Sequence, residues 1–206
     1  MRRVNPLDPL IQELKKWPGI GEKSAQRLAF FLLSLKQNDV TKMAHTMVDT
    51  RDSIKYCKDC FNISLHDQCH ICSSTKRDRA SLCIVAEPKD IFAIEKTHAY
   101  TGIYHVLGGL ISPLDGVHPE SLRIKELIQR IQNNTFHEVL FAINPSIEGD
   151  STSLYLTSLL EPFKLNITKL AYGLPMGSDI DYADEITLTK AISARREITN
   201  SIPIMP

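Results

Sequence analysis

The chain has 206 residues, of which 43% are hydrophobic and 23% charged, a composition that excludes wholesale disorder and allows one large domain or two small ones. Its 24 Lys and Arg residues balance its 24 Asp and Glu residues. Over the whole chain this zero net charge argues against a nucleic-acid-binding protein, because such proteins normally carry a basic excess. The sequence has no run of about 18 apolar residues and no apolar signal-peptide segment at its N-terminus, so we expect a cytoplasmic protein without a membrane span.

The first 55 residues predict a small helical unit. A helix is expected over residues 8–17, with Asp8 as its N-cap and Pro9 in its first turn. A second helix follows, and a third is expected to begin at Asp39. Apolar residues at helical spacing mark one face of each of these two helices: Ala25, Leu28, Ala29, Leu32 and Leu33 in the second, and Val40, Met43, Ala44, Met47 and Val48 in the third.

The turn between the first two helices, Pro18-Gly19-Ile20-Gly21, resembles that of the helix-hairpin-helix DNA-binding motif. Gly19 and Gly21 would let the backbone approach a phosphate without a Cβ in the way, and the free N–H groups of the next helix would point at that anion. Lys23 and Arg27 are four residues apart, so they would project from one side of the helix toward adjoining phosphates. Such contacts bind DNA without reading base sequence. The alternative is an ordinary turn followed by solvated basic residues.

Four of the five cysteines lie in one 16-residue window, as Cys57-x2-Cys60 and Cys69-x2-Cys72. Two such pairs on tight turns can close a tetrahedral shell around one zinc ion, and four thiolates leave no open position for water. The spacing therefore predicts one structural zinc per chain, whose binding would contribute to the folding of residues 56–79. His66 and His70 lie in the same segment and are alternative ligands.

The pattern changes near residue 80. The apolar run Ser81–Ala86 predicts a buried strand in which Cys83 is a small core residue. The elements expected after it are a helix over 88–97, extended and loop segments over 100–118, a helix over 119–132, a strand over 138–143, a helix over 151–163, a strand over 167–172 and a helix over 184–197. Strands that alternate with helices predict βαβ units and a mostly parallel sheet. Residues 200–206 are expected to be a poorly ordered tail or an interaction arm.

The zero net charge averages two unlike halves. Residues 1–79 carry 14 Lys and Arg against 9 Asp and Glu, a net charge of +5. Residues 80–206 carry 10 against 15, a net charge of −5. The basic half holds the hairpin and the cysteines, so the overall balance no longer excludes a nucleic-acid partner.

Polar residues follow two of the predicted strands. Glu87 ends the first, and Asn144, Ser146, Glu148 and Asp150 follow the strand over 138–143. This layout resembles the Toprim domain of topoisomerases and primases, which holds magnesium with an acidic residue after one strand and an Asp-x-Asp pair after another. Asn144 and Ser146 occupy the two Asp positions, and neither is charged. We interpret the region as a degenerate Toprim domain used for binding or assembly. The alternative is a magnesium-dependent nuclease or primase-like enzyme that uses Glu87, Glu148 and Asp150.

The order of these parts resembles the RecR family of bacterial recombination mediators over nearly the whole chain. The segments that carry the resemblance are the hairpin with Lys23 and Arg27, the four cysteines, Tyr104–Gly109, Ser112–Gly116, Glu148–Thr152, Gly173–Gly177 and Asp181–Glu185. The expected fold is therefore a mixed α+β and α/β one. It comprises a helix-hairpin-helix region (1–55), a four-cysteine zinc finger (56–79), a Toprim domain with a mostly parallel sheet (80–177), and a C-terminal helical segment and tail (178–206).

The resemblance also implies a function. Members of the family are non-enzymatic repair proteins that form ring-like dimers and tetramers and bind single- and double-stranded DNA without sequence preference. They act with RecO and RecF proteins to load the RecA recombinase at gaps. By resemblance, Lys23 and Arg27 would line the DNA path and the Toprim domain would contact RecO. The N-terminal helices and a helix near Ala191–Ile198 would build the ring.

Overall fold

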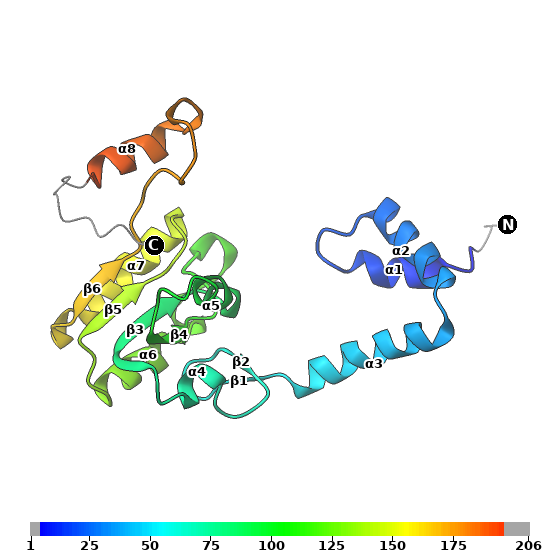
Figure 1. Ribbon diagram of the computed structural model, residues 1–206, viewed down its shortest axis with the longest axis horizontal. Helices are drawn as coiled ribbons and strands as arrows, with labels where there is room; N and C mark the ends of the chain where they lie inside the picture. The colour runs from blue at the N-terminus through cyan, green and yellow to red at the C-terminus, as the bar shows by residue number, and fades with distance from the viewer. Residues whose placement is uncertain (1–4, 196–206) are drawn as a thin grey trace. The chain divides into compact units, whose positions relative to one another are not determined.

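The computed structural model describes residues 5–195, and Figure 1 shows the elements in chain order. The chain divides into two compact units, residues 1–54 and residues 55–206. Within the described residues, no helix has the length and apolar character needed to cross a membrane. The predicted tail over 200–206 lies outside the described residues, and the helix predicted over 184–197 ends earlier, at Ser193.

The first unit contains three helices: α1 (Asp8–Lys15), α2 (Glu22–Ser34) and α3 (Gln37–Ser53). Its small core joins α1 to α2 through Ile11, Leu14, Ala25 and Ala29. The prediction that Asp8 caps α1 is wrong by one residue, because Leu7 occupies the cap position without a side-chain bond. Asp8 instead lies in the first turn, where its negative charge interacts favourably with the positive end of the helix dipole and so stabilises the helix.

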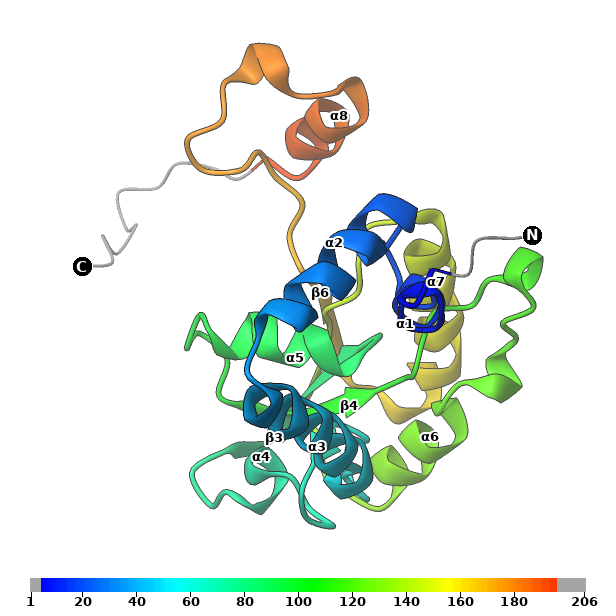
Figure 2. The ribbon, with the colours of Figure 1, turned by 90° about the vertical axis from the view of Figure 1, so that its right-hand side faces the viewer.

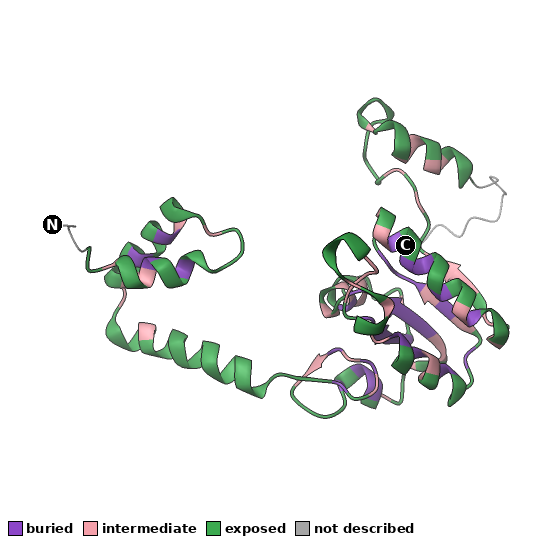
Figure 3. Cartoon of the chain, turned by 180° about the vertical axis from the view of Figure 1, so that it is seen from behind, coloured by how far each residue is buried: buried purple, intermediate pink, exposed green. Residues whose placement is uncertain are grey.

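The apolar faces predicted for α2 and α3 are only partly buried. In α2, Ala25 and Ala29 are buried, whereas Leu28 and Leu33 are exposed. No described residue of α3 is buried, as its exposed ribbon in Figure 3 shows. Helical spacing places residues on one face but does not determine whether another element covers that face.

The second unit is built on a four-stranded parallel sheet with the order β4-β3-β5-β6, which confirms the predicted parallel topology. Its strands are β3 (Asp78–Val85), β4 (Gly102–Val106), β5 (Glu138–Phe141) and β6 (Asn166–Lys169). The helices that follow or precede them are α5 (Pro88–Glu95), α6 (Ile124–Gln132), α7 (Ile147–Leu160) and α8 (Glu185–Ser193). Strand β4 falls in the stretch 100–118, which the sequence pattern assigned only to extended and loop segments.

Alternating side chains give this sheet two buried faces. Leu82 and Ile84 of β3 belong to one hydrophobic cluster, with residues of α6 and α7. Cys83 and Val85 of the same strand belong to the other cluster, which also contains the four remaining cysteines and Ile91 of α5. Figure 2 shows α5 on one side of β4 and α6 and α7 on the other. The buried position of Cys83 agrees with its predicted role as a core residue.

Several helices and strands have other boundaries in the structure than the sequence predicts. The helix expected over 151–163 begins at Ile147, because the Ser146 hydroxyl accepts a bond from the Gly149 N–H and caps it. The helix expected over 119–132 is a short 3-10 turn, Pro119–Ser121, followed by α6. Residues 55–79 contain the hairpin of β1 (Lys55–Tyr56) with β2 (Ile63–Ser64) and the short helix α4 (His70–Ser73).

Candidate nucleic-acid interface and metal centre

The four predicted cysteine ligands converge. All four side chains are buried, and their Sγ atoms lie within 4.8 Å of one another. The Sγ atoms of Cys60 and Cys69 are 3.6 Å apart, close to the separation of about 3.8 Å that tetrahedral Zn–S bonds of about 2.3 Å require. Within the described residues, neither His66 nor His70 belongs to the cluster, so the alternative ligands are not placed at the site.

The backbone around the cysteines holds this arrangement. Cys57 N–H donates to the Asn62 carbonyl at 2.7 Å, and Phe61 takes a left-handed conformation at φ 62° to close the first turn. Cys69 N–H donates to Cys57 Sγ at 3.3 Å, a contact that joins the two Cys-x2-Cys turns. Hydrogen bonds from Cys60 and Cys72 hold the pKa of the Cys69 thiol below its usual value. The cluster can therefore hold a metal ion, with no place for a reacting water.

The cysteine-bearing segment is fixed to the sheet by a cationic side chain. The Arg123 guanidinium lies 4.9 Å from the Tyr56 ring centroid and 4.8 Å from that of Phe61. Arg123 N–H donates to the Leu107 carbonyl, and the Arg123 carbonyl lies 2.8 Å from His105 Nε2. This contact was not predicted, because nothing local in the sequence pairs residues 56 and 123.

His105 is a buried histidine of β4. Its side chain is fully buried, and burial lowers the pKa of its imidazole to about 4, with the Arg130 and Arg123 guanidinium groups acting in the same direction. A neutral ring at neutral pH then makes one hydrogen bond, to the Arg123 carbonyl. This places His105 in the packing between the cysteine segment and the sheet.

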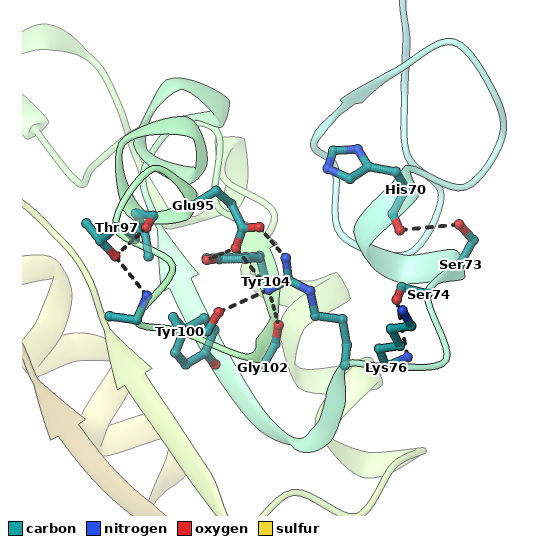
Figure 4. Close-up of polar contacts among 12 residues, drawn as sticks. His70, Ser73, Ser74, Lys76, Glu95, Thr97, Tyr100, Gly102 and Tyr104 are labelled. Carbon is teal, nitrogen blue, oxygen red and sulfur yellow. Dashed lines mark hydrogen bonds and ion pairs between the residues drawn. The ribbon is translucent and has the colours of Figure 1, made fainter.

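A second fixed contact lies at the end of α5. Both guanidinium nitrogens Nη1 and Nη2 of Arg77 bond to the Glu95 carboxylate, and the Tyr104 hydroxyl donates to the same carboxylate at 2.6 Å. Figure 4 shows Glu95 facing Tyr104, with Gly102 and Tyr100 close by. Burial raises the pKa of the Glu95 carboxyl, but the bonds from Arg77 and Tyr104 outweigh it and leave the pKa below its usual value. This ion pair therefore ties α5 to β3 and β4.

Replacing Glu95 with Gln should cost about 1.5–3 kcal/mol of unfolding free energy at pH 7, because it removes hydrogen bonds to a charged group. A carboxyl whose folded pKa is lowered stabilises the fold above its unfolded pKa, and this contribution is lost as the pH falls through the folded pKa. Urea unfolding at pH 7 and pH 3 should therefore show a large difference between E95Q and the parent at pH 7 and a smaller one at pH 3. The exposed Glu120→Gln is the control, and a difference for E95Q that is equal at both pH values would contradict this role.

The hairpin turn leaves its backbone open to an incoming group. Gly19 has φ +78°, a conformation that favours glycine, and a Cβ at Gly21 would meet nothing within 4 Å. Gly21 is therefore required neither by backbone strain nor by internal packing, which leaves close approach of an external group as a physical reason for a glycine. Gly21 is also the N-cap of α2 and makes no side-chain cap bond.

Lys23 and Arg27 lie on α2 with exposed side chains. Within the described residues, neither has a carboxylate within 4.0 Å. The one acidic residue in the first turn of α2, Glu22, is 2.5 Å from Lys15, and the hydrogen bond from Lys15 lowers the pKa of this carboxyl. Unpaired cations and a paired acid make the start of α2 a candidate anion site.

The predicted Toprim residues lie at one edge of the sheet, because β3 and β5 are neighbouring parallel strands. Glu87 is the N-cap of α5, where it forms a reciprocal capping box with Asp90, and its carboxylate is 2.7 Å from Lys89. Ser146 caps α7. Exposed Glu148 has a lowered pKa because its own N–H and the Ser146 hydroxyl bond to it.

The last carboxylate of this edge, Asp150, is paired with cations. Its Oδ1 accepts bonds from Lys169 at 2.6 Å and from the Tyr172 hydroxyl at 3.0 Å, and Lys190 of α8 lies 3.7 Å from Oδ2. The bond from Lys169 is the main reason why the pKa of this carboxyl is lowered. Among the described residues, no three carboxylates gather within metal-binding distance. Neither lysine was predicted as a partner of Asp150, although Lys169 is the last residue of a strand whose carboxyl end lies beside Asp150.

Three family models match successive parts of the chain. The RecR helix-hairpin-helix model matches residues 7–51, the Toprim domain model matches residues 80–171, and the RecR C-terminal model matches residues 173–196. The cysteine cluster lies in the interval between the first two matches. Because two of the three models are specific to RecR proteins and all three occur in order, the chain belongs to the RecR family.

Proposed function

We propose that this protein is a non-enzymatic DNA-binding recombination mediator that acts in the cytoplasm with RecO and RecF proteins to promote RecA loading at gaps. The observation that carries the proposal is the open start of α2. No packing within the protein requires a glycine at residue 21, and Lys23 and Arg27 have no carboxylate partner in the described part of the chain. Membership of the RecR family supports a role in recombination. Contacts of this kind favour sequence-independent binding of single- and double-stranded DNA.

Three further parts of the proposal rest on the second unit and on α3. The four cysteines hold one structural zinc ion, since four thiolates with tetrahedral spacing suit zinc. The acidic edge with Glu87 and Glu148 is a docking surface for RecO. The chain assembles as a homodimer or tetramer ring, for which the exposed Met43, Met47 and Val48 of α3 are suitable contact residues.

The residues at this edge of the sheet support the proposal that the protein does not cleave DNA. Asn144 and Ser146 carry no charge, and Asp150 is neutralised by Lys169. A magnesium site needs convergent carboxylate oxygens. Incubation of the protein with labelled DNA and Mg²⁺ should leave the DNA intact, and cleavage that disappears in Glu87→Gln would establish the enzyme alternative instead.

The double variant Lys23→Ala, Arg27→Ala should bind a short single-stranded oligonucleotide at least tenfold more weakly, because two phosphates are no longer neutralised by the protein. The slope of log affinity against log salt should become shallower by about 1.4, or about 0.7 for each of these two phosphates on a single strand. Fluorescence anisotropy over a salt series measures both quantities.

The matched control for this pair removes two cations from α3 in the same unit, as Lys42→Ala, Arg51→Ala. It should change the affinity much less. Equal losses of affinity in the two double variants would show that the loss comes from the lower net charge of the protein and not from the hairpin site. Unchanged affinity in the hairpin variant would contradict the proposal.

A further inference from the structure

A pocket of about 420 Å³ lies in the second unit, between the cysteine segment, the start of β3 and α6. This volume is within the range of ordinary ligand sites. Three cationic side chains line it, one from each element: Lys58, Arg79 and Arg130. It lies outside the hairpin and does not include the Toprim residues Glu87, Asn144 or Ser146.

The two arginines are held in place by carbonyl groups. Arg79 donates to the Cys72 carbonyl at 2.9 Å, and Arg130 donates to the Tyr104 carbonyl at 2.6 Å. Each guanidinium has five N–H donors, so most of them stay available to a ligand. The guanidinium groups are thus pre-positioned, which lowers the entropy lost when an oxyanion binds.

None of the three cations forms an ion pair within the described part of the chain. In residues 5–195, no carboxylate lies within 4.0 Å of Lys58, Arg79 or Arg130. Arg130 is half-buried, and a partly desolvated charge without a partner is unfavourable. An anionic ligand would provide the missing partner, and a phosphate matches the planar guanidinium group with two parallel hydrogen bonds.

Two carboxylates also line the pocket, and they differ in effect. The Asp59 carboxylate accepts a bond from the Gln68 amide at 2.7 Å, which uses one of its oxygens. Glu126 is exposed and lies one helical turn from Arg130 without pairing to it. Glu126 should therefore weaken anion binding, and removing its charge should strengthen it.

We propose that this pocket binds a backbone phosphate of single-stranded DNA, as a second DNA contact on the unit that does not carry the hairpin. The inference rests on the proposed function, since it assumes that DNA is the partner. The amide side chains of Gln129 and Asn133, which also line the pocket, add neutral hydrogen-bond donors, so the pocket would bind the strand without reading its sequence.

The test uses the full-length, metal-loaded protein and a fluorescent oligothymidine. Lys58→Ala should weaken binding about two- to tenfold and make the salt slope shallower by about 0.7. Arg130→Gln should act in the same direction, and Glu126→Gln should tighten binding about twofold. Lys125→Ala is the control, because Lys125 is on the same helix but lines a different pocket. Unchanged binding in K58A and R130Q, or an equal loss of affinity in K125A, would overturn the inference.

A measurement without substitutions separates this pocket from the hairpin. Amine acetylation read by mass spectrometry should show Lys58 protected by the oligonucleotide and Lys125 unprotected. Protection of Lys23 alone would overturn the second contact and leave the proposed function standing, whereas protection of neither Lys23 nor Lys58 would overturn both. Inorganic phosphate at the same phosphate concentration should protect Lys58 less than the DNA does, and equal protection would assign the pocket to free anions instead.

Discussion

Replacing Cys72 with Ser should abolish metal binding and unfold the cysteine-bearing segment, residues 57–74. Structural zinc sites of this type contribute about 10–16 kcal/mol of apparent binding free energy, which becomes folding free energy when the site exists only in the folded state. Apart from its cysteines, the segment has few buried residues, among them Asn62 and Ile71. It therefore has little packing of its own to hold it once the metal is gone.

The destabilisation should extend into the sheet. The four cysteines share a hydrophobic cluster with Val85, Tyr104 and Val106, so unfolding the segment exposes one face of β3 and β4 to water. We expect the metal content to fall from one ion per chain to none and the melting temperature of the second unit to fall with it. Elemental analysis and differential scanning calorimetry measure these two quantities.

Thiol reactivity offers a sharper version of the same test. All five cysteines are buried, and burial raises the pKa of the Cys83 thiol to about 12. A strong chelator should make the four cluster thiols react quickly at neutral pH, whereas in the metal-loaded protein all five thiols should react only on global unfolding. The control Cys83→Ala should keep its metal. Full metal content in C72S, or cluster thiols that stay unreactive after chelation, would show that the cluster is not a structural metal site.

The features that could be predicted well from the sequence are those specified by local spacing. Two Cys-x2-Cys pairs place their thiols on tight turns, and in the folded chain all four Sγ atoms lie within 4.8 Å of one another. Alternating strands and helices predict a parallel sheet, because a parallel connection needs a crossover element. The parallel sheet in turn brings Glu87 and Asn144 to one edge, since β3 and β5 are neighbours.

The features that could not be predicted depend on contacts between distant residues. Arg123 between Tyr56 and Phe61, and Lys190 beside Asp150, each join residues far apart in the chain. Their identity as partners depends on how loops and helix ends lie over the sheet, which residue spacing does not encode. The exposed face of α3 is a similar case. A helical pattern predicts an apolar face but does not identify the element that would cover it.

Replacing Gly149 with Ala should destabilise the second unit by about 3 kcal/mol, which lowers the melting temperature by about 6–12 °C for a domain of this size. A Cβ at residue 149 would lie 2.0 Å from the Asn144 carbonyl oxygen and 3.1 Å from Ile143 Cγ2. The first of these atoms belongs to the backbone, so the clash cannot be relieved by a side-chain rotation. Either α7 must move away from the end of β5, or the Ser146 cap must break.

Gly173→Ala is the matched control, because a Cβ there meets nothing within 4 Å and its φ is not in the left-handed region. That substitution should be neutral or slightly stabilising, since alanine reduces the freedom of the unfolded chain. Thermal unfolding of both variants separates a steric effect from a general consequence of replacing glycine. If G149A has the same melting temperature as the parent, the tight approach of α7 to residue 144 is not a feature of the folded protein. The arrangement of Asn144, Ser146 and Glu148 at the Toprim edge would then need a different structural basis.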